Sequence, residues 1–518
     1  MHTDAIIEAV GCMSRFQILM VVFIFCPRML MAWGMLIMSF AGTTPDWWCL
    51  PATAPSVDET DYMNNVTLKL CPTSDNISCQ VVYSQDKNTI VSEWGLICDR
   101  KEVNPLVTSV QMAGVFVGAL LGGQSADVLG RKWTYFVCLV LQGGFNLVAA
   151  FSVNWQMFTV LRFLIGMMTG SLLVVCYPYF IEFVGKKWRS LASAIPVWVT
   201  GVCAFALSSW LRPDWSHQHI ILAALHLPFF AGWFFVPESL HWLAVKGRTD
   251  EAEKVVDQMS RYNKREKPTN TLQLLKQVAE EEQKLRASGS KYTYLDIYRG
   301  WSICWKSLII QFVWACLSLV YYGISFGAGR LAGNLYLNIF LLGVVEVPTT
   351  VLTFFTNNKF GRKWTAVGFF AVATSAAFGV AIIAKTVSKD EQGVIINVLA
   401  LVTKLGVGGA WAVYGLWSNE TYPTVIRNLG YGAANTAARV GGMIAPYVFA
   451  GGDGNLVEPF VIVGSTMAVC GVLSVVMKDT KDQPLADTMG NQKNTRGDVT
   501  MVANHKDIET QEALASLS

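Results

Sequence analysis

Long apolar runs recur along the chain and are separated by short polar loops. A helix needs about 20 apolar residues to cross the hydrocarbon core of a bilayer. Runs of that length predict six helices at residues 16–40, 105–126, 133–151, 157–181, 191–211 and 219–236. Six more are predicted at residues 304–326, 334–355, 364–384, 394–416, 428–449 and 458–477. We therefore expect an all-α polytopic membrane protein with twelve transmembrane helices in two six-helix bundles, the outline of a two-half transporter.

The polar stretches around these runs predict the domain organisation. The expected parts are an N-terminal segment at 1–15, a first bundle at 16–236 with a long loop at 41–104, a linker at 237–303, a second bundle at 304–477 and a tail at 478–518. The composition of the tail predicts disorder.

Composition agrees with a membrane protein. Hydrophobic residues make up 53% of the chain and charged residues only 15%, whereas a soluble domain carries about 25% charged residues. The net charge of +3 is too small to indicate a nucleic-acid partner. The first apolar run is too long for the core of a secretory signal peptide.

Loop charge predicts the orientation. Lys and Arg follow the second, fourth, eighth and tenth runs, as at Arg131, Lys187, Arg362 and Arg427, and they are frequent in the linker. The positive-inside rule places these loops, and with them both termini, in the cytoplasm. The loop at 41–104 is then extracellular.

That outer loop has the features of an exported segment. Its four cysteines predict two disulfides, with three connectivities left open: Cys49, Cys71, Cys79 and Cys98. Two sequons predict glycosylation at Asn65 and Asn76.

The loop motifs reveal an internal duplication. Gly-Arg-Lys-Trp-Thr occurs at 130–134 after the second run and again at 361–365 after the eighth. A Glu precedes an Arg by seven residues after both the fourth run and the tenth run. Pro237-Glu238-Ser239 ends the sixth run, and Asp479-Thr480 is a weaker echo after the twelfth.

Charged residues in these motifs predict ion pairs at the cytoplasmic face of each half. Arg forks can bridge carboxylates at neighbouring helix ends, and such pairs suit a gate with two states. The alternative is that the charges only anchor topology. The predicted gate residues are Asp127, Arg131, Glu182, Arg189, Glu238, Arg362, Glu420 and Arg427.

These motifs together resemble the major facilitator superfamily and, within it, the organic cation, organic anion and carnitine transporter family. The segments that carry the resemblance are 92–99, 123–132, 237–243, 346–348 and 420–428. Asn358 departs from the pattern where the second copy would parallel Asp127, and Leu240-His241 stands where relatives usually have Pro-Arg.

The resemblance implies transport by alternating access across the plasma membrane, with small organic ions, drugs or zwitterions such as carnitine as substrates. No cofactor is expected, because the sequence has no nucleotide-binding or metal-ligand motif. The coupling ion, sodium or a proton, stays open, and the oligomeric state is not predicted.

Four charged residues inside the predicted spans are candidates for determining substrate specificity, because an ionised group there costs about 2.5–3.5 kcal/mol on insertion scales. Arg439 stands where relatives that carry anions or carnitine tend to have Arg, and it could bind a substrate carboxylate. Its alternative role is an internal salt bridge. Glu346 could receive a substrate ammonium group or carry a proton, or it could be the standing partner of Arg439 or Lys404. Lys404 has the same ambiguity between substrate and ion-pair roles. Arg28 could face the substrate cavity, with snorkelling or helix pairing as its alternative.

Aromatic residues are candidates for binding the cationic end of a substrate. Trp314 and Tyr321 are seven residues apart and so share a helix face, and Tyr322 follows. The alternative is ordinary packing.

A buried Arg, a buried Glu and aromatic residues together favour a zwitterion that bears a carboxylate and an amine. The alternatives are an organic anion or an organic cation and, from another class, a channel or a solute sensor. We expect no enzyme, because no metal-ligand spacing, phosphate-binding glycine loop or nucleophile motif is present.

Overall fold

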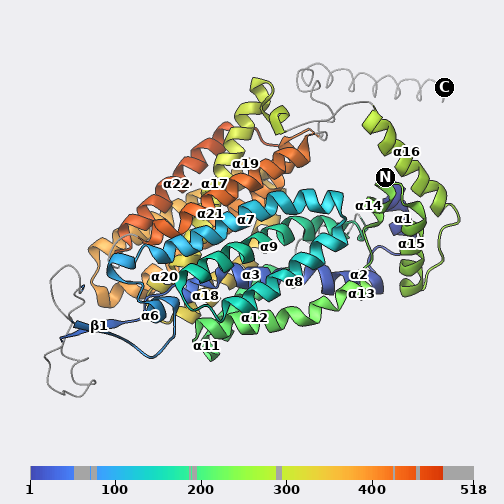
Figure 1. Ribbon diagram of the computed structural model, residues 1–518. Helices are drawn as coiled ribbons and strands as arrows, with labels where there is room; N and C mark the ends of the chain where they lie inside the picture. Colours follow the sequence, from blue (N-terminus) through green and yellow to red (C-terminus); the bar gives the residue numbers. More distant parts are fainter. Residues whose placement is uncertain are drawn as a thin grey trace, which may run out of the picture.

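The computed structural model describes residues 2–51, 71, 79–185, 188–189, 195–287, 294–423, 426–450 and 455–481. The molecule is an elongated bundle of helices, with a short strand pair at one end and a group of short helices at the other (Figure 1). We call these the strand end and the linker end. The predicted glycosylation sites Asn65 and Asn76 and the tail from 482 lie outside the described residues.

The first spanning segment is irregular. It consists of α2 (Arg15–Met20), a π-helical turn η1 (Val21–Phe25), α3 (Arg28–Leu36) and α4 (Met38–Ala41). Pro27 follows the π-helical turn and cannot donate a backbone hydrogen bond, so the helix restarts at Arg28. The other helices of the first half are α7 (Val103–Val128), α8 (Arg131–Ala149), α9 (Trp155–Ile181), α11 (Val197–Leu211), α12 (Trp215–Phe230) and α13 (Gly232–Phe235).

The second half has fewer but longer helices. They are α17 (Trp301–Phe326) with the 3₁₀ turn η4 (Gly327–Arg330), α18 (Leu335–Val344), α19 (Glu346–Thr386), α20 (Lys389–Thr421), α21 (Arg427–Ala450) and α22 (Val457–Val476). Gly361 divides α19 with a φ of +83°, a conformation that favours glycine. The predicted eighth run therefore covers α18 and the start of α19, and the predicted ninth run lies in α19 beyond Gly361.

Eight helical stretches of the described chain are long and apolar enough to cross a membrane. One of them, 335–386, contains the break at Gly361. The helices α8, α11 and α21 lie where spans were expected, but α11 is short and the other two are not among the eight. The total of twelve crossings stays a prediction.

The linker end is built from helices outside the predicted spans. The linker contains α14 (Leu240–Val245), α15 (Thr249–Asn263), α16 (Thr271–Ala287) and the 3₁₀ turn η3 (Tyr294–Tyr298). The N-terminal segment forms another helix, α1 (His2–Val10), which packs against α15 and α16.

The outer-loop prediction corresponds to the strand end. β1 (Trp47–Pro51) pairs antiparallel with β2 (Cys79–Tyr83). A disulfide joins Cys71 to Cys98, and Cys49 is also disulfide-bonded. The Cys79 side chain lies outside the described part. The short helix α6 (Ile90–Trp94) then fixes the loop to the first half, because Trp215 Nε1 donates to Glu93 Oε2 at 2.5 Å.

Close helix packing within each half depends on glycine. A Cβ on Gly118 of α7 would lie 1.8 Å from the Met167 carbonyl oxygen of α9. A Cβ on Gly441 of α21 would lie 1.9 Å from the Ala315 carbonyl oxygen of α17. Small residues let membrane helices approach to backbone contact, which is how such bundles gain dispersion energy.

The two halves meet along α7 with α21 and α11 with α18. Ser109 Oγ of α7 donates to the Met443 carbonyl of α21 at 2.6 Å. The rings of Phe40 and Tyr336 are 6.0 Å apart. These residues lie in the half of the bundle toward the strand end, so the two halves are closed against each other there. At the linker end Asp127 is 73% exposed.

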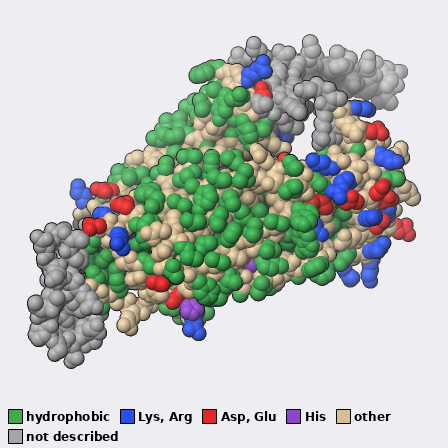
Figure 2. Space-filling view, viewed as in Figure 1, with side chains coloured by type: hydrophobic (Ala, Val, Ile, Leu, Met, Phe, Trp, Pro, Cys, Tyr) green, Lys and Arg blue, Asp and Glu red, His purple; other side chains and the backbone are tan. Residues whose placement is uncertain are grey.

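The outer surface of the bundle suits a bilayer. Figure 2 shows hydrophobic side chains covering the visible face, with acidic and basic side chains gathered toward the two ends. Exposed apolar residues occur on α7, α8, α19 and α22, including Leu121, Val140, Phe354 and Val472. In water such a surface would be unfavourable.

Candidate functional site

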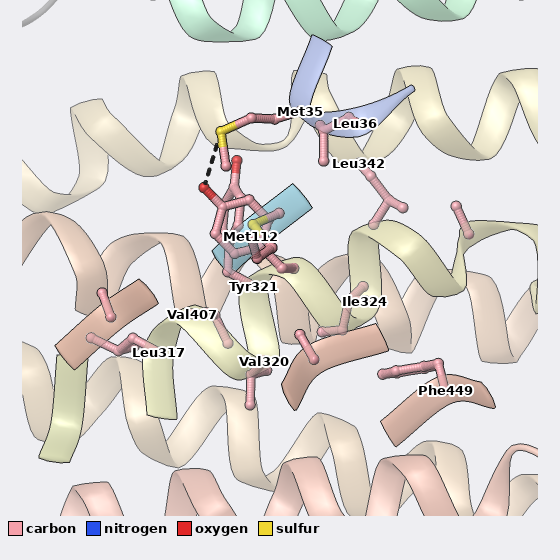
Figure 3. Packing of buried hydrophobic residues seen from close by; sticks show 14 of the residues in the cluster. Met35, Leu36, Met112, Leu317, Val320, Tyr321, Ile324, Leu342, Val407 and Phe449 are labelled. Carbon is pink, nitrogen blue, oxygen red and sulfur yellow. Dashed lines mark hydrogen bonds between the residues drawn. The ribbon is translucent and has the colours of Figure 1, made fainter. Parts of the chain in front are cut away.

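A pocket lies between the two halves, near the middle of the bundle. Its walls come from α3, α4, α11, α17, α18, α19 and α20. The lining residues are Leu36, Ser39, Val202, Tyr321, Ser325, Ile339, Leu342, Glu346 and Lys404. Figure 3 shows part of this region, where Met35 and Met112 of the first half lie near Tyr321 of α17 and Leu36 lies near Leu342 of α18.

Glu346 reaches the pocket because its helix is interrupted. The α18 helix ends at Val344 and α19 begins at Glu346, two residues before Pro348. Pro348 lacks the backbone N–H that a continuous helix would use at this point. Glu346 thus lies in the first turn of α19, where a carboxylate is favoured by the helix dipole.

Glu346 and Lys404 form the polar wall of the pocket. Lys404 Nζ lies 3.8 Å from Glu346 Oε1, and the Lys404 side chain is only 2% exposed. The ammonium also donates to Ser325 Oγ at 2.7 Å. Tyr321 OH donates to Glu346 Oε1 at 2.6 Å, and Trp198 Nε1 donates to Tyr321 OH at 3.0 Å. Of the two partners considered for Glu346, the structure selects Lys404.

A row of aromatic rings leads away from this wall. Ring centroids are separated by 5.7 Å between Tyr321 and Trp411, 5.6 Å between Trp411 and Trp314, and 5.4 Å between Trp314 and Tyr431. Tyr322 lies 5.2 Å from Tyr321. Trp314 and Tyr321 both contact Trp411, which confirms that they share a face of α17.

Arg439 lies elsewhere and has no acidic partner. Its Nη2 donates to Asn435 Oδ1 at 3.4 Å, and its buried Nε has no hydrogen-bond acceptor. It also interacts electrostatically with Tyr322. Among the described residues, no carboxylate lies within ion-pair distance of Arg439.

Arg28 is the first residue of α3, in the first half. Its guanidinium carbon lies 5.0 Å from the centre of the Phe25 ring, and no carboxylate of the described chain pairs with it. Arg28 begins α3 of the first half and Arg439 lies in α21 of the second, so each half contributes one guanidinium that no described carboxylate neutralises.

The first-half motif residues form a compact cluster at the linker end. Arg131 Nη1 lies 2.8 Å from Asp127 Oδ1, and its Nε lies 3.7 Å from Glu182 Oε1. Glu238 accepts from the backbone N–H of Arg131 at 2.9 Å and so caps α8. Ser239 Oγ donates to Glu182.

The second half repeats this cluster. Arg362 binds Glu420 through two hydrogen bonds, Nη2 to Oε1 at 2.7 Å and Nε to Oε2 at 2.9 Å. Asp479 accepts from the Arg362 backbone N–H at 3.1 Å, and Thr480 Oγ1 donates to Glu420 at 2.5 Å. Asp479 and Thr480 thus take the places of Glu238 and Ser239. Asn358 stands where the first half has Asp127, so the second cluster has one fewer carboxylate. Arg362 makes two hydrogen bonds to Glu420, whereas Arg131 Nε lies 3.7 Å from Glu182.

Two motif arginines are placed differently from the rest. Arg189 Nη2 pairs with Asp4 Oδ1 of the N-terminal helix at 2.6 Å, and the structure gives no Arg189–Glu182 pair within the described chain. Arg427 is the first residue of α21, close to residues 424–425, which lie outside the described part. Their fixed spacing from Glu182 and Glu420 does not by itself identify their partners.

A fully buried arginine was missed in the sequence analysis. Arg162 of α9 has 0% exposure, donates to the Gly34 carbonyl at 3.2 Å and hydrogen-bonds to Gln111. The signal was available, because Arg162 lies inside the predicted fourth span. The buried side chains around it are also polar: Gln142, Asn146, Thr169, His219 and His226.

Comparison with known proteins identifies the family. The sugar (and other) transporter family matches residues 64–488. The organic cation transporter protein of Drosophila melanogaster is 32% identical over 85% of this chain and 80% of its own length. The human organic cation/carnitine transporter 2 is 31% identical over 80% of this chain and 73% of its own length.

The fold is that of a solved transporter. The partially occluded inward-open xylose transporter XylE from E. coli superimposes with a TM-score of 0.60 over 90% of this chain and all of XylE, at 17% identity. The relatives are membrane transporters rather than enzymes, and this fold works without a bound cofactor. The chain therefore belongs to the sugar (and other) transporter family of the major facilitator superfamily and, within it, to the organic cation, organic anion and carnitine transporter family.

Proposed function

We propose that the protein carries small organic solutes that bear a carboxylate across the plasma membrane by alternating access. One observation carries the proposal: Arg28 and Arg439 come from opposite halves and have no acidic partner among the described residues. An unpaired guanidinium inside a membrane protein is costly, so it marks a functional site unless a partner is found.

A carboxylate substrate would supply that partner. Arginine binds a carboxylate through two parallel hydrogen bonds, which fixes orientation as well as adding binding energy. A substrate held between the two halves would contact both arginines only when the halves are close together. Its binding would thereby favour an occluded state, which alternating access requires.

The polar wall formed by Glu346 and Lys404 argues against a second site that binds a charged group of the substrate. Glu346 already lies 3.8 Å from Lys404 and accepts a hydrogen bond from Tyr321. An ammonium group of the substrate would have to displace Lys404 from that carboxylate. We therefore rank an organic anion first, ahead of the zwitterion that the sequence favoured.

The aromatic row supports the zwitterion as a second candidate. A quaternary ammonium group over a desolvated Trp face can gain about 2 kcal/mol. Trp314 and Trp411 lie between Tyr431 and Tyr321 in this row and could supply such a face. One relative is named an organic cation/carnitine transporter.

The topology completes the proposal. Twelve crossings would place the strand end outside, with glycans at Asn65 and Asn76, and the linker end and both termini in the cytoplasm. Two disulfides among Cys49, Cys71, Cys79 and Cys98 would then form in an oxidising compartment. The driving force would be the solute gradient or coupled sodium or protons.

Uptake by cells that express the protein tests the substrate class. The probes are para-aminohippurate as an anion, carnitine as a zwitterion and tetraethylammonium as a cation, each with and without sodium and at neutral and mildly acidic pH. We expect anion uptake that Arg439→Ala and Arg28→Ala each reduce at least about tenfold, the loss of one charged hydrogen bond. Val440→Ala, on the exposed face of the same helix, is the matched control and should be neutral.

Two results would change the assignment. Carnitine uptake that depends on both arginines and on Trp314 would establish the second candidate. If only tetraethylammonium is carried and Arg439→Ala has no effect, the carboxylate-binding role is wrong.

A further inference from the structure

A buried hydrogen-bond junction connects the transport pocket to the core of the first half. Gly34 lies in the last turn of α3, and the last carbonyls of a helix have no partner within it. The α3 helix ends at Leu36 and α4 starts at Met38, so the spanning segment is interrupted beside the pocket. The Gly34 carbonyl therefore needs donors from other helices.

Two side chains supply those donors. Gln111 Nε2 of α7 donates to the Gly34 carbonyl at 3.0 Å, and Arg162 Nη2 of α9 donates to the same oxygen at 3.2 Å. Arg162 also hydrogen-bonds to Gln111 Oε1, which orients the amide toward Gly34. One carbonyl of the first spanning segment is thus held by two neighbouring helices.

The charge at this junction is not explained by an ion pair. Arg162 is fully buried, and none of the described carboxylates pairs with it. Its Nε and Nη1 have no acceptor within the described chain. A neutral side chain would satisfy one carbonyl at a lower desolvation penalty, so the guanidinium requires a further reason.

The residues next to Gly34 give that reason, because they face the second half. Met35 Sδ lies 3.8 Å from the Tyr322 hydroxyl, the contact drawn as a dashed line in Figure 3. Leu36 and Ser39 line the pocket opposite Glu346 and Lys404. The position of this short segment therefore decides where the first-half wall of the pocket lies.

We propose that Arg162 is a positioning residue for transport: together with Gln111 it holds the Gly34 carbonyl and so fixes residues 34–39 against the second half. The role of this wall in substrate binding rests on the proposed function, whereas the placement of the segment does not. Arg162 acts through the backbone of Gly34 and touches no pocket-lining residue in the hydrogen bonds that the structure describes.

Kinetics with whichever probe is carried provide the first test. Arg162→Met should raise KM roughly tenfold, the loss of one charge-assisted hydrogen bond, with a smaller change in maximal rate. Gln111→Leu should raise KM less, and the double variant should add little, because both residues act on one carbonyl. Thr169→Val is the matched control, because Thr169 lies on the same helix as Arg162. This change removes the buried hydrogen bond that Gln142 of α8 donates to Thr169, and it leaves the donors to Gly34 in place. It should lower stability and leave KM unchanged.

A second readout does not depend on any substrate. A Cβ on Gly329 would lie 3.6 Å from the Thr43 Cβ, within the range for a disulfide. Thr43 follows the 34–39 segment, so the rate at which Thr43→Cys and Gly329→Cys cross-link reports its position. Arg162→Met should slow this reaction several-fold and Thr169→Val should not.

The two readouts separate the possible failures. If none of the probes is carried, the proposed function fails, and cross-linking alone still tests the positioning role. If Arg162→Met leaves the cross-linking rate unchanged, or changes KM no more than Thr169→Val does, Arg162 is only a structural charge and the inference is wrong.

Discussion

Replacing Glu346 with Gln should destabilise the protein through Lys404. The Lys404 side chain is 2% exposed, and Glu346 is the carboxylate that the described structure pairs with it. Removing one partner of a buried ion pair typically costs about 3–5 kcal/mol. The lower end applies here, because the Lys404 ammonium keeps its hydrogen bonds to Ser325 and the Tyr321 carbonyl.

The expected shift in melting temperature follows from the size of the chain. For 518 residues that unfold together at about 2.1 cal/mol/K per residue, a loss of about 3 kcal/mol lowers Tm by about 3 °C. The assay is thermal unfolding of the purified protein in detergent, followed by size-exclusion chromatography after heating.

Two variants make the result interpretable. Glu346→Gln combined with Lys404→Met should recover most of the stability, because no unpaired buried charge remains. Glu458→Gln is the matched control, since Glu458 is also in the first turn of a helix but is exposed. Equal Tm values for Glu346→Gln and wild type would refute the idea that the pair stabilises the pocket.

Two further substitutions test other parts of the structure. Gly118→Val should prevent folding, because even its Cβ would lie 1.8 Å from the Met167 carbonyl oxygen. The yield of monodisperse protein after extraction measures folding, and a yield equal to that of the wild type would contradict the prediction. Asp4→Asn should loosen the N-terminal helix by breaking the 2.6 Å pair with Arg189, whereas Glu8→Gln on the exposed face of the same helix should not. Limited proteolysis of the N-terminal segment compares the two, and equal cleavage rates would argue against the pair.

The architecture was largely predictable because membrane crossing imposes strong periodic constraints. Apolar runs identified most of the helices in both halves, and the repeated loop motifs predicted a duplication that the hydrogen bonds reproduce. Even the weak echo at Asp479 proved informative, because it caps its helix as Glu238 does. Such motifs contact the loop and the helix ends beside them, so their position relative to the apolar runs predicts much of their structural role.

The partners of buried charges were not predictable in the same way. Glu346 and Lys404 are 58 residues apart, and only the packing of α19 on α20 brings them to 3.8 Å. Arg189 pairs with Asp4 because an N-terminal helix packs on the linker, a contact that no pattern in the apolar runs indicates. Arg162 was overlooked for a simpler reason, because it is a single charged residue within a long apolar run. Its insertion into the membrane nevertheless costs as much free energy as that of Arg28, Glu346, Lys404 or Arg439.

Locking the strand end tests the central claim, transport by alternating access, most directly. Thr43→Cys and Gly329→Cys place one cysteine on each half, at a Cβ separation suited to a disulfide. The assay is uptake of the carried probe before oxidation, after oxidation and after mild reduction, with each single-cysteine variant as a control. The account predicts that oxidation abolishes uptake only in the double variant and that reduction restores it. Continued uptake by fully cross-linked protein would contradict alternating access and point to a channel-like path.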